Sequence, residues 1–121
     1  MRPATVVLGC AADPVSRANA RLLAGACPGE VLDIVVWPEV AASWLRQARR
    51  FTAHGPDAWV VTGTPAGWAG MARRLAHSTN WSARRTVATS GLAGVAFEEA
   101  FDEALAGLRG AYQDGRPWEV V

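Results

Sequence analysis

Four times along this chain an apolar run rich in valine gives way to an amphipathic stretch, and this alternation constrains the fold more than any other feature. The apolar runs cover residues 4–9, 31–36, 58–62 and 86–89. Short apolar runs followed by helical patterns are typical of βα units that share one parallel sheet. Because crossovers between parallel strands are right-handed, we expect an α/β doubly wound sheet.

The stretches between the apolar runs carry helix signals. Asp13 can cap a helix over residues 14–26, and Pro14 fits its first turn. A second helix is expected over residues 39–53 and a third through Met71 and Leu75. Apolar stripes are expected in the second helix at Val40, Trp44, Ala48 and Phe51, and in a fourth at Phe97, Phe101, Leu105, Leu108 and Tyr112.

The length and composition limit the functional classes. A chain of 121 residues is large enough for one domain, residues 1–121, and the tail at 116–121 could add a short fifth strand. A formal charge of +1 provides no field that would attract nucleic acid, and no apolar run is long enough to span a membrane. The first residues leave no room for a signal peptide, so we expect a cytoplasmic protein.

Cysteine and histidine give no metal signal. Cys10 and Cys27 lack metal-ligand spacing, and a cytosolic setting argues against a disulfide between them. His54 and His77 lack the neighbours of a catalytic triad or a metal site. Cys10 is either a nucleophile at the end of the first strand or a small buried apolar residue.

The segment from Gly63 to Ala72 follows the third apolar run and leads directly into a helix, which is typical of a ligand-binding loop. Its glycines and Pro65 let the backbone turn sharply and approach a bound molecule, and Trp68 offers a flat apolar surface. In an open α/β sheet, ligands bind beyond the carboxyl ends of the strands where the strand order reverses. We therefore expect the loops after the first, third and fourth strands to form one crevice.

At this segment the sequence resembles flavodoxin-like NAD(P)H:quinone reductases and related reductases of flavin mononucleotide (FMN). That family runs Gly-Thr-Pro, two variable residues, an aromatic residue, two small or polar residues and then Met-Ala. The residues in register are Gly63, Thr64, Pro65, Trp68, Met71 and Ala72. Trp81 and the run from Val87 to Gly91 are also similar to the family, so the resemblance covers residues 57–95.

The resemblance implies a flavodoxin-like three-layer sandwich with strand order 2-1-3-4, and an FMN site in the crevice. The first loop would hold the phosphate, with help from Ser16, Arg17 and Asn19. Asn19 and Leu22 also match an Asn-x-x-Leu pattern of the FMN reductases. The remaining cofactor-binding residues would be Thr64, Pro65, Ala66, Gly67 and Trp68 on one side of the flavin ring, and Ser90, Gly91 and Gly94 at its other edge.

The first loop departs from the family pattern. The family fills this loop with Ser and Thr, whereas this chain has the run from Cys10 to Asp13, and Asp13 would repel a phosphate dianion. Asp13 and Pro14 could instead simply start a helix. Trp68 could likewise be a lid over the core, and Trp37 could line the rim of the crevice or pack at the surface edge.

Three functions stay open. The first is a small FMN-binding electron carrier or NAD(P)H-dependent reductase of a quinone-like acceptor, for which the flavin itself would perform the chemistry. The second is an enzyme of the same fold that has lost flavin and binds another small molecule, with Asp13, Cys10 and Ser90 as the first residues to mutate. The third is a non-catalytic accessory subunit that binds a partner chain.

Two surface features bear on partners. A flavodoxin sheet carries one more helix at its end, so we expect an incompletely covered sheet face and a homodimer that covers it. Arginines at 46, 49 and 50 and at 73 and 74 make basic faces on the second and third helices. Such faces are commonly solvated, but they could dock an acidic redox partner or a nicotinamide cofactor's phosphate.

Overall fold

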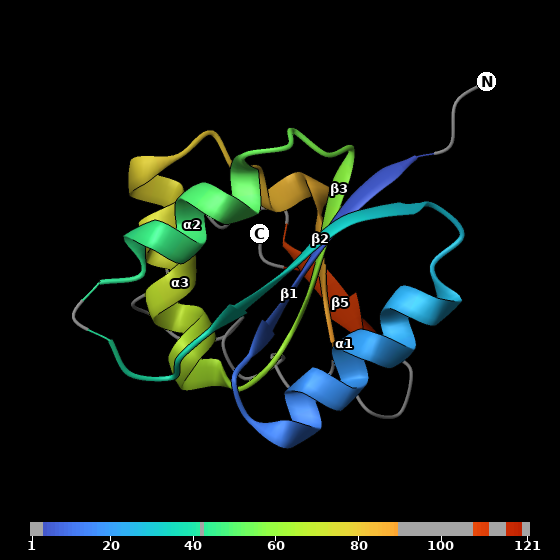
Figure 1. Cartoon of the computed structure of the whole chain (residues 1–121), viewed down its shortest axis with the longest axis horizontal. Helices are drawn as coiled ribbons and strands as arrows, with labels where there is room; N and C mark the ends of the chain where they lie inside the picture. The colour runs from blue at the N-terminus through green and yellow to red at the C-terminus, as the bar shows by residue number, and fades with distance from the viewer. Residues whose placement is uncertain (1–3, 42, 90–107, 112–115, 120–121) are drawn as a thin grey trace.

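A computed structural model describes residues 4–41, 43–89, 108–111 and 116–119 (Figure 1). Strands and helices alternate as the sequence predicts: β1 (Thr5–Ala11), α1 (Pro14–Ala26), β2 (Glu30–Trp37), α2 (Leu45–Thr52), β3 (Ala58–Thr62) and α3 (Pro65–Ser78). A short 3-10 helix, η1 (Ala83–Arg85), then leads into β4 (Thr86–Ala88). Two further strands follow, β5 (Arg109–Ala111) and β6 (Pro117–Glu119).

The strands form one sheet in the order β2-β1-β3-β4-β5-β6. The first five strands are parallel, and β6 runs antiparallel to β5 at the edge. β1 lies between β2 and β3, so Leu8 lies between Ile34 on β2 and Val60 on β3. The strand order reverses between β1 and β3, and the predicted flavodoxin-like α/β architecture is confirmed.

The helices lie on both faces of the sheet. Figure 1 shows α2 and α3 together on one face and α1 on the other. The main core lies under α2 and α3, where inward residues of β1, β2, β3 and β4 meet apolar residues of both helices. Its largest fully buried side chains include Trp37, Phe51, Trp68, Met71 and Leu75. Alternate residues of each strand point to opposite faces, so Leu8 and Cys10 face α1 instead.

Aromatic rings form a continuous series through this core, which we call the aromatic series. It runs from Trp81 through Trp68, Trp37 and Phe51 to Trp59, with ring centroids 5.7 to 6.3 Å apart. The indole N–H of Trp59 donates a hydrogen bond to the carbonyl of Phe51 at 2.8 Å. The indole nitrogens of Trp37, Trp68 and Trp81 are buried without a hydrogen-bond partner.

The second helix is shorter than the sequence predicts. It begins at Leu45 rather than at residue 39, and Val40 is 87% exposed instead of facing the core. The indole N–H of Trp44 donates to the carbonyl of Pro38 at 2.9 Å. This carbonyl would have accepted the first bond of a helix that began at residue 39, so the tryptophan holds the segment before α2 as a loop.

The last part of the range expected for a fourth helix is a strand instead. Arg109–Ala111 is the strand β5, so the apolar stripe does not continue in a helix as far as Tyr112. Gly110, a weak helix former, pairs with Ala88 of β4. Leu108 is buried as expected, whereas residues 90–107 and Tyr112 lie outside the described residues. The predicted short strand in the tail is confirmed as β6.

Candidate functional site

The predicted crevice corresponds to the carboxyl ends of β1 and β3 and the starts of α1 and α3, which we call the carboxyl edge. The two strand ends approach closely, because a Cβ placed on Gly63 would lie 3.1 Å from the Cβ of Ala11. The hydroxyl of Thr89 donates to that of Thr62 at 3.0 Å and ties the end of β4 to this edge. Ser90, Gly91 and Gly94 of the third predicted loop lie outside the described residues.

At the start of α1, where the predicted site would hold the FMN phosphate, the carboxylate of Asp13 takes the place of the anion. The Oδ2 atom of Asp13 accepts a hydrogen bond from the backbone N–H of Ser16 at 3.0 Å, which confirms Asp13 as the helix cap. The Nε–H of Arg17 donates to the carbonyl of Ala12 at 2.8 Å. Asn19 is exposed. Of the three residues expected to hold a phosphate, Ser16 and Arg17 thus already have partners within the loop.

The charge of Asp13 is fixed by the same contacts. Hydrogen bonds from the side chain of Ser16, and then from its backbone N–H, hold the pKa of the Asp13 carboxyl below its ordinary value. Asp13 is therefore ionised at neutral pH, in the position where a flavodoxin-like site would seat the FMN phosphate. Its second oxygen, Oδ1, is shielded from solvent and has no hydrogen-bond partner. These residues do not fit a phosphate dianion.

A second carboxylate lies at the start of α3. Thr64 precedes the helix but makes no side-chain cap bond, because its hydroxyl donates to Oε1 of Glu39 at 2.6 Å. Gly67 is buried, and a Cβ on it would lie 3.1 Å from the Cα of Glu39. The side chains of Pro65 and Ala66 lie outside the described set. Sequence reasoning missed Glu39, although its place directly after the second strand and Pro38 puts it at this edge.

Trp68 lies in the core rather than at the surface of the carboxyl edge. Its side chain is fully buried between Trp37 at 5.7 Å and Trp81 at 5.9 Å. The ring face that we expected to stack on a planar ligand is therefore covered by protein. Trp37, expected at the rim or the surface edge, is also fully buried. Both residues carry apolar rings at positions where the helix and the strand face the core, and that contact decides their orientation.

Cys10 is a buried thiol. It is 1% exposed, and burial, the largest effect, raises its pKa above the ordinary value. It borders a hollow of about 120 Å³ that is also lined by Arg17, Arg21 and Ile34. A raised pKa disfavours the thiolate that a nucleophile needs, so the geometry supports the apolar alternative. Cys10 and Cys27 are both free cysteines.

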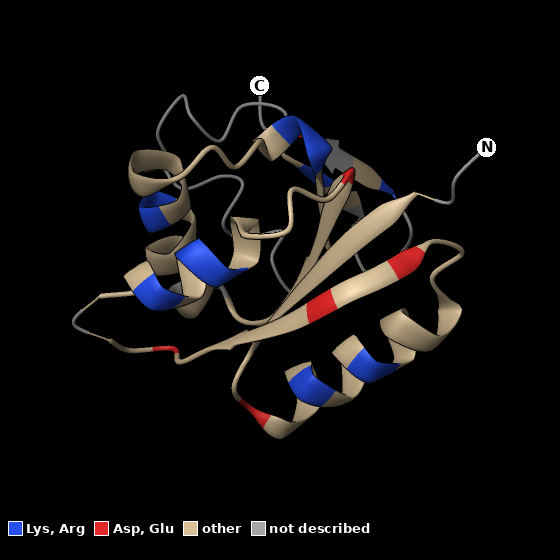
Figure 2. Ribbon diagram, turned by 45° about the horizontal axis from the view of Figure 1, so that its top comes forward, with Lys and Arg blue, Asp and Glu red and all other residues tan. Residues whose placement is uncertain are grey.

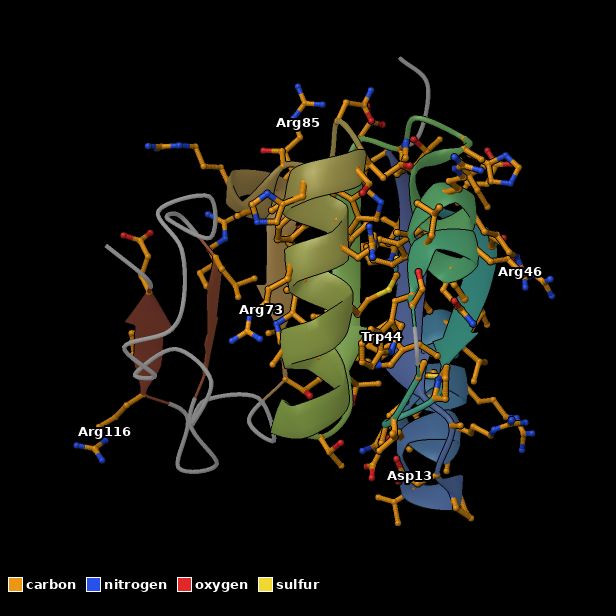
Figure 3. The ribbon with its side chains drawn as sticks, turned by 90° about the vertical axis from the view of Figure 1, so that its left-hand side faces the viewer. Asp13, Trp44, Arg46, Arg73, Arg85 and Arg116 are labelled. Carbon is orange, nitrogen blue, oxygen red and sulfur yellow. The ribbon has the colours of Figure 1, made fainter. Side chains whose placement is uncertain are left out.

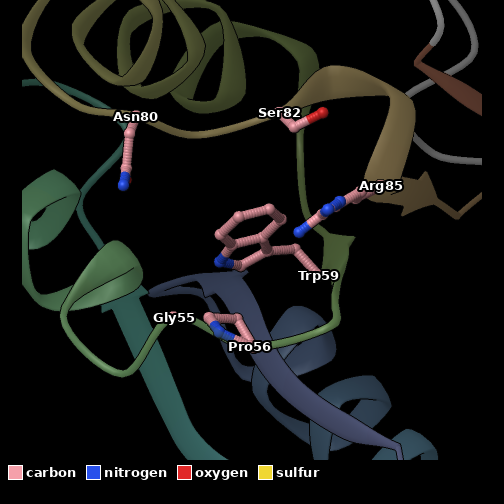
Figure 4. A pocket seen from close by; sticks show the side chains of 6 residues that line it. All are labelled: Gly55, Pro56, Trp59, Asn80, Ser82 and Arg85. Atoms are coloured by element: carbon pink, nitrogen blue, oxygen red, sulfur yellow. The ribbon is translucent and has the colours of Figure 1, made fainter.

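A separate hollow of about 340 Å³ lies near the opposite ends of the strands. Its lining comes from the turn before β3, from β3 itself, and from the segment that joins α3 to β4: Gly55, Pro56, Trp59, Asn80, Ser82 and Arg85. Figure 4 shows the side chains of Asn80 and Arg85 directed toward the indole of Trp59. Nothing in the sequence pattern singled out this hollow, because its polar residues lie in the segment that joins α3 to β4 and meet Trp59 and the turn before β3 only in the folded chain.

Comparison of the chain with protein-family models, with curated proteins and with solved structures gives no match. The function must therefore be argued from the geometry of the site. Among the described residues, no helix has the length and apolar character needed to cross a bilayer.

Proposed function

We propose that this chain is a flavodoxin-fold protein that no longer anchors FMN, and that its carboxyl edge binds a small molecule without a phosphate group. The observation that carries the proposal is the ionised carboxylate of Asp13 at the start of α1. The negative charge of Asp13 favours a ligand that offers an N–H or O–H group over one that offers a phosphate. We expect this ligand to be neutral or cationic and the protein to act in the cytoplasm.

The electrostatics of the carboxyl edge support this choice of ligand. Asp13 and Glu39 place carboxylates near the first turns of α1 and α3, where the free N–H groups of a helix would otherwise attract an anion. Near a protein surface, two like unit charges about 4 Å apart repel by roughly 4 kcal/mol. A phosphate dianion would face that repulsion, whereas an amine or hydroxyl donor would not.

An FMN titration tests the proposal. We expect the wild-type protein to be colourless when purified and not to quench flavin fluorescence when FMN is added at micromolar concentration. Asp13→Ser keeps a capping side chain but removes the negative charge, and we expect it to bind FMN at least about tenfold more tightly, a gain of about 1.4 kcal/mol. Asp33→Asn, on β2 and away from Asp13, serves as the control and should behave like the wild type.

The alternative outcome supports the other candidate function. A yellow protein, or a wild type that binds FMN with micromolar affinity, would overturn the proposal that this chain no longer anchors FMN. It would support the FMN-binding electron carrier or NAD(P)H-dependent reductase that the resemblance over residues 57–95 predicts. The strand reversal between β1 and β3 favours this alternative, because it is where flavodoxin-like sheets bind their cofactor.

We also propose that two copies of the chain pair through the face that carries α1. Two large apolar side chains of α1 point to solvent, with Val15 69% and Leu22 72% exposed. On the same side of the sheet, Val87 of β4 is 38% exposed. An apolar hollow of about 250 Å³ lies beside α1, lined mainly by Leu8, Leu23, Ala26, Cys27, Pro28 and Val60. An exposed apolar ridge beside an apolar hollow suits a two-fold contact, in which each copy supplies both parts.

A further inference from the structure

The outer surface of α3 carries a hollow that neither the carboxyl edge nor the α1 face explains. It has a volume of about 360 Å³ and is lined by Trp44, Gly70, Arg73, Arg74 and His77. We call it the basic hollow. Figure 3 looks onto this surface, with Trp44 and Arg73 on opposite flanks of α3. Its volume falls at the small end of the range that ligand-binding pockets occupy.

The hollow follows from the spacing of residues along α3. Positions 70, 73, 74 and 77 are three or four residues apart, so they share one face of the helix. Gly70 leaves room for the ring of Trp44, because a Cβ there would lie 2.5 Å from the indole Cη2. The indole N–H of Trp44 also donates a hydrogen bond to the carbonyl of Pro38, and this bond holds the ring in place. An aromatic ring is thus held beside a basic helix face.

The charge on the two helices α2 and α3 is all of one sign. The sequences of α2 and α3 contain five arginines and no aspartate or glutamate, and Figure 2 shows basic bands without acidic ones on both helices. Arg50 pairs with Asp33 at 2.7 Å, and Arg74 donates to the hydroxyl of Ser78 at 3.3 Å. Arg73 is exposed beside Arg74. Arg73 and Arg74 bring two like charges to one hollow, and a bound anion would relieve their repulsion.

We propose that the basic hollow binds a planar aromatic molecule that carries a phosphate or a carboxylate. The ring would lie against Trp44, and the anionic group would accept hydrogen bonds from Arg73 and Arg74. Guanidinium groups suit both anions because their planar N–H groups match the two oxygens. This site is on the outside of α3 and is independent of the ligand proposed for the carboxyl edge.

Calorimetric titration of the full chain tests the site. The probes are adenosine monophosphate, 2-naphthoate, adenosine and inorganic phosphate. We expect at least one of the two aromatic anions to bind with a Kd below about 1 mM, and at least about tenfold more tightly than adenosine or phosphate alone. If adenosine monophosphate binds more tightly than 2-naphthoate, the site prefers a phosphate; the reverse order shows that it prefers a carboxylate. Binding should weaken as salt is added, because the anionic group contacts arginines.

Variants test whether the aromatic anions bind at the basic hollow. We expect Trp44→Leu, and the double variant Arg73→Gln with Arg74→Gln, each to weaken binding about tenfold or more. Arg84→Gln, on η1 outside the lining of the hollow, removes the same charge elsewhere and should bind like the wild type. Circular dichroism shows whether each variant folds. Binding that is absent at 1 mM, equal for phosphate and the aromatic anions, or unchanged in the Arg73 and Arg74 variant would overturn the proposal.

Discussion

At the scale of single residues, Gly9 determines how closely the aromatic core approaches the strand β1. Gly9 lies in the middle of β1, and a Cβ on it would overlap the ring of Trp37 and lie 2.7 Å from Cε1 of Phe51. Trp37 and Phe51 are themselves fully buried and cannot move toward solvent. The absence of a side chain at this position therefore allows two large rings to pack against the strand.

Replacing Gly9 tests this packing. Gly9→Ala forces a methyl group into two buried rings, and we expect the free energy of unfolding to fall by about 1–3 kcal/mol. Gly25→Ala is the matched control, because no atom lies within 4 Å of the Cβ position on this α1 residue. Alanine favours a helix, so the control should raise stability by about 0.5–1 kcal/mol. Urea unfolding measures both, and equal effects would contradict the packing argument.

Residue-level prediction from the sequence succeeded where the contacts are local. Asp13 caps α1 because a carboxylate three residues before an N–H is within reach whatever the rest of the chain does. The position of Trp68 depends on Trp37 and Trp81, which come from distant parts of the chain, so periodicity alone could not place its ring. Glu39 was missed for the same reason, because its partner Thr64 is 25 residues away.

At the scale of elements, α2 is attached to the sheet by one ion pair at its outer side. Nε and Nη2 of Arg50 donate to the two carboxylate oxygens of Asp33 on β2, at 2.8 and 2.7 Å. The inner side of α2 is held by Ala48 and Phe51, which are fully buried. A helix of eight residues is too short to be stable alone, so both attachments contribute to its order.

The ion pair makes stability depend on pH in a predictable direction. The hydrogen bond from Arg50 holds the pKa of Asp33 below its ordinary value. The contribution is therefore present above about pH 4 and is lost as the pH falls through the lowered pKa. The Arg50 side chain is 56% exposed, so solvent screening keeps the effect below about 1 kcal/mol.

Asp33→Asn provides the comparison. We expect the unfolding free energy of the wild type to fall more between pH 7 and pH 3 than that of the variant, because the variant has no carboxylate to protonate at this position. Urea unfolding of both proteins at the two pH values measures the difference. Identical losses in the two proteins would show that the Arg50–Asp33 pair does not act on stability.

At the scale of the whole molecule, the alternation of apolar runs and amphipathic stretches was enough to predict most of the fold. The three described βα units, the strand β4 and the strand order 2-1-3-4 follow from valine-rich runs, right-handed crossovers and the family resemblance. The strand β5 did not follow, because its three residues pair with β4 only across a long connection and have no apolar run of their own. Long-range pairing, rather than local pattern, sets such short strands.

The exposed apolar side chains of α1 bear on the state of association. We expect light scattering at micromolar concentration to give about twice the 12.8 kDa mass of one chain. A double variant, Val15→Glu with Leu22→Glu, places charges on the proposed contact and should be monomeric. Val40→Glu is the matched control, because Val40 is 87% exposed in a loop away from α1. A wild type with the mass of one chain would rule out the pair.

The aromatic series also has an optical consequence. Four of its members are indoles, and each ring lies within about 6 Å of the next, so an excitation absorbed by one passes to its neighbours before emission. Native fluorescence of this protein is then a collective property with low polarisation, and removing a single tryptophan changes the light emitted by the others. Unfolding separates the rings and exposes them to water, so a red shift of the emission reports the loss of the core.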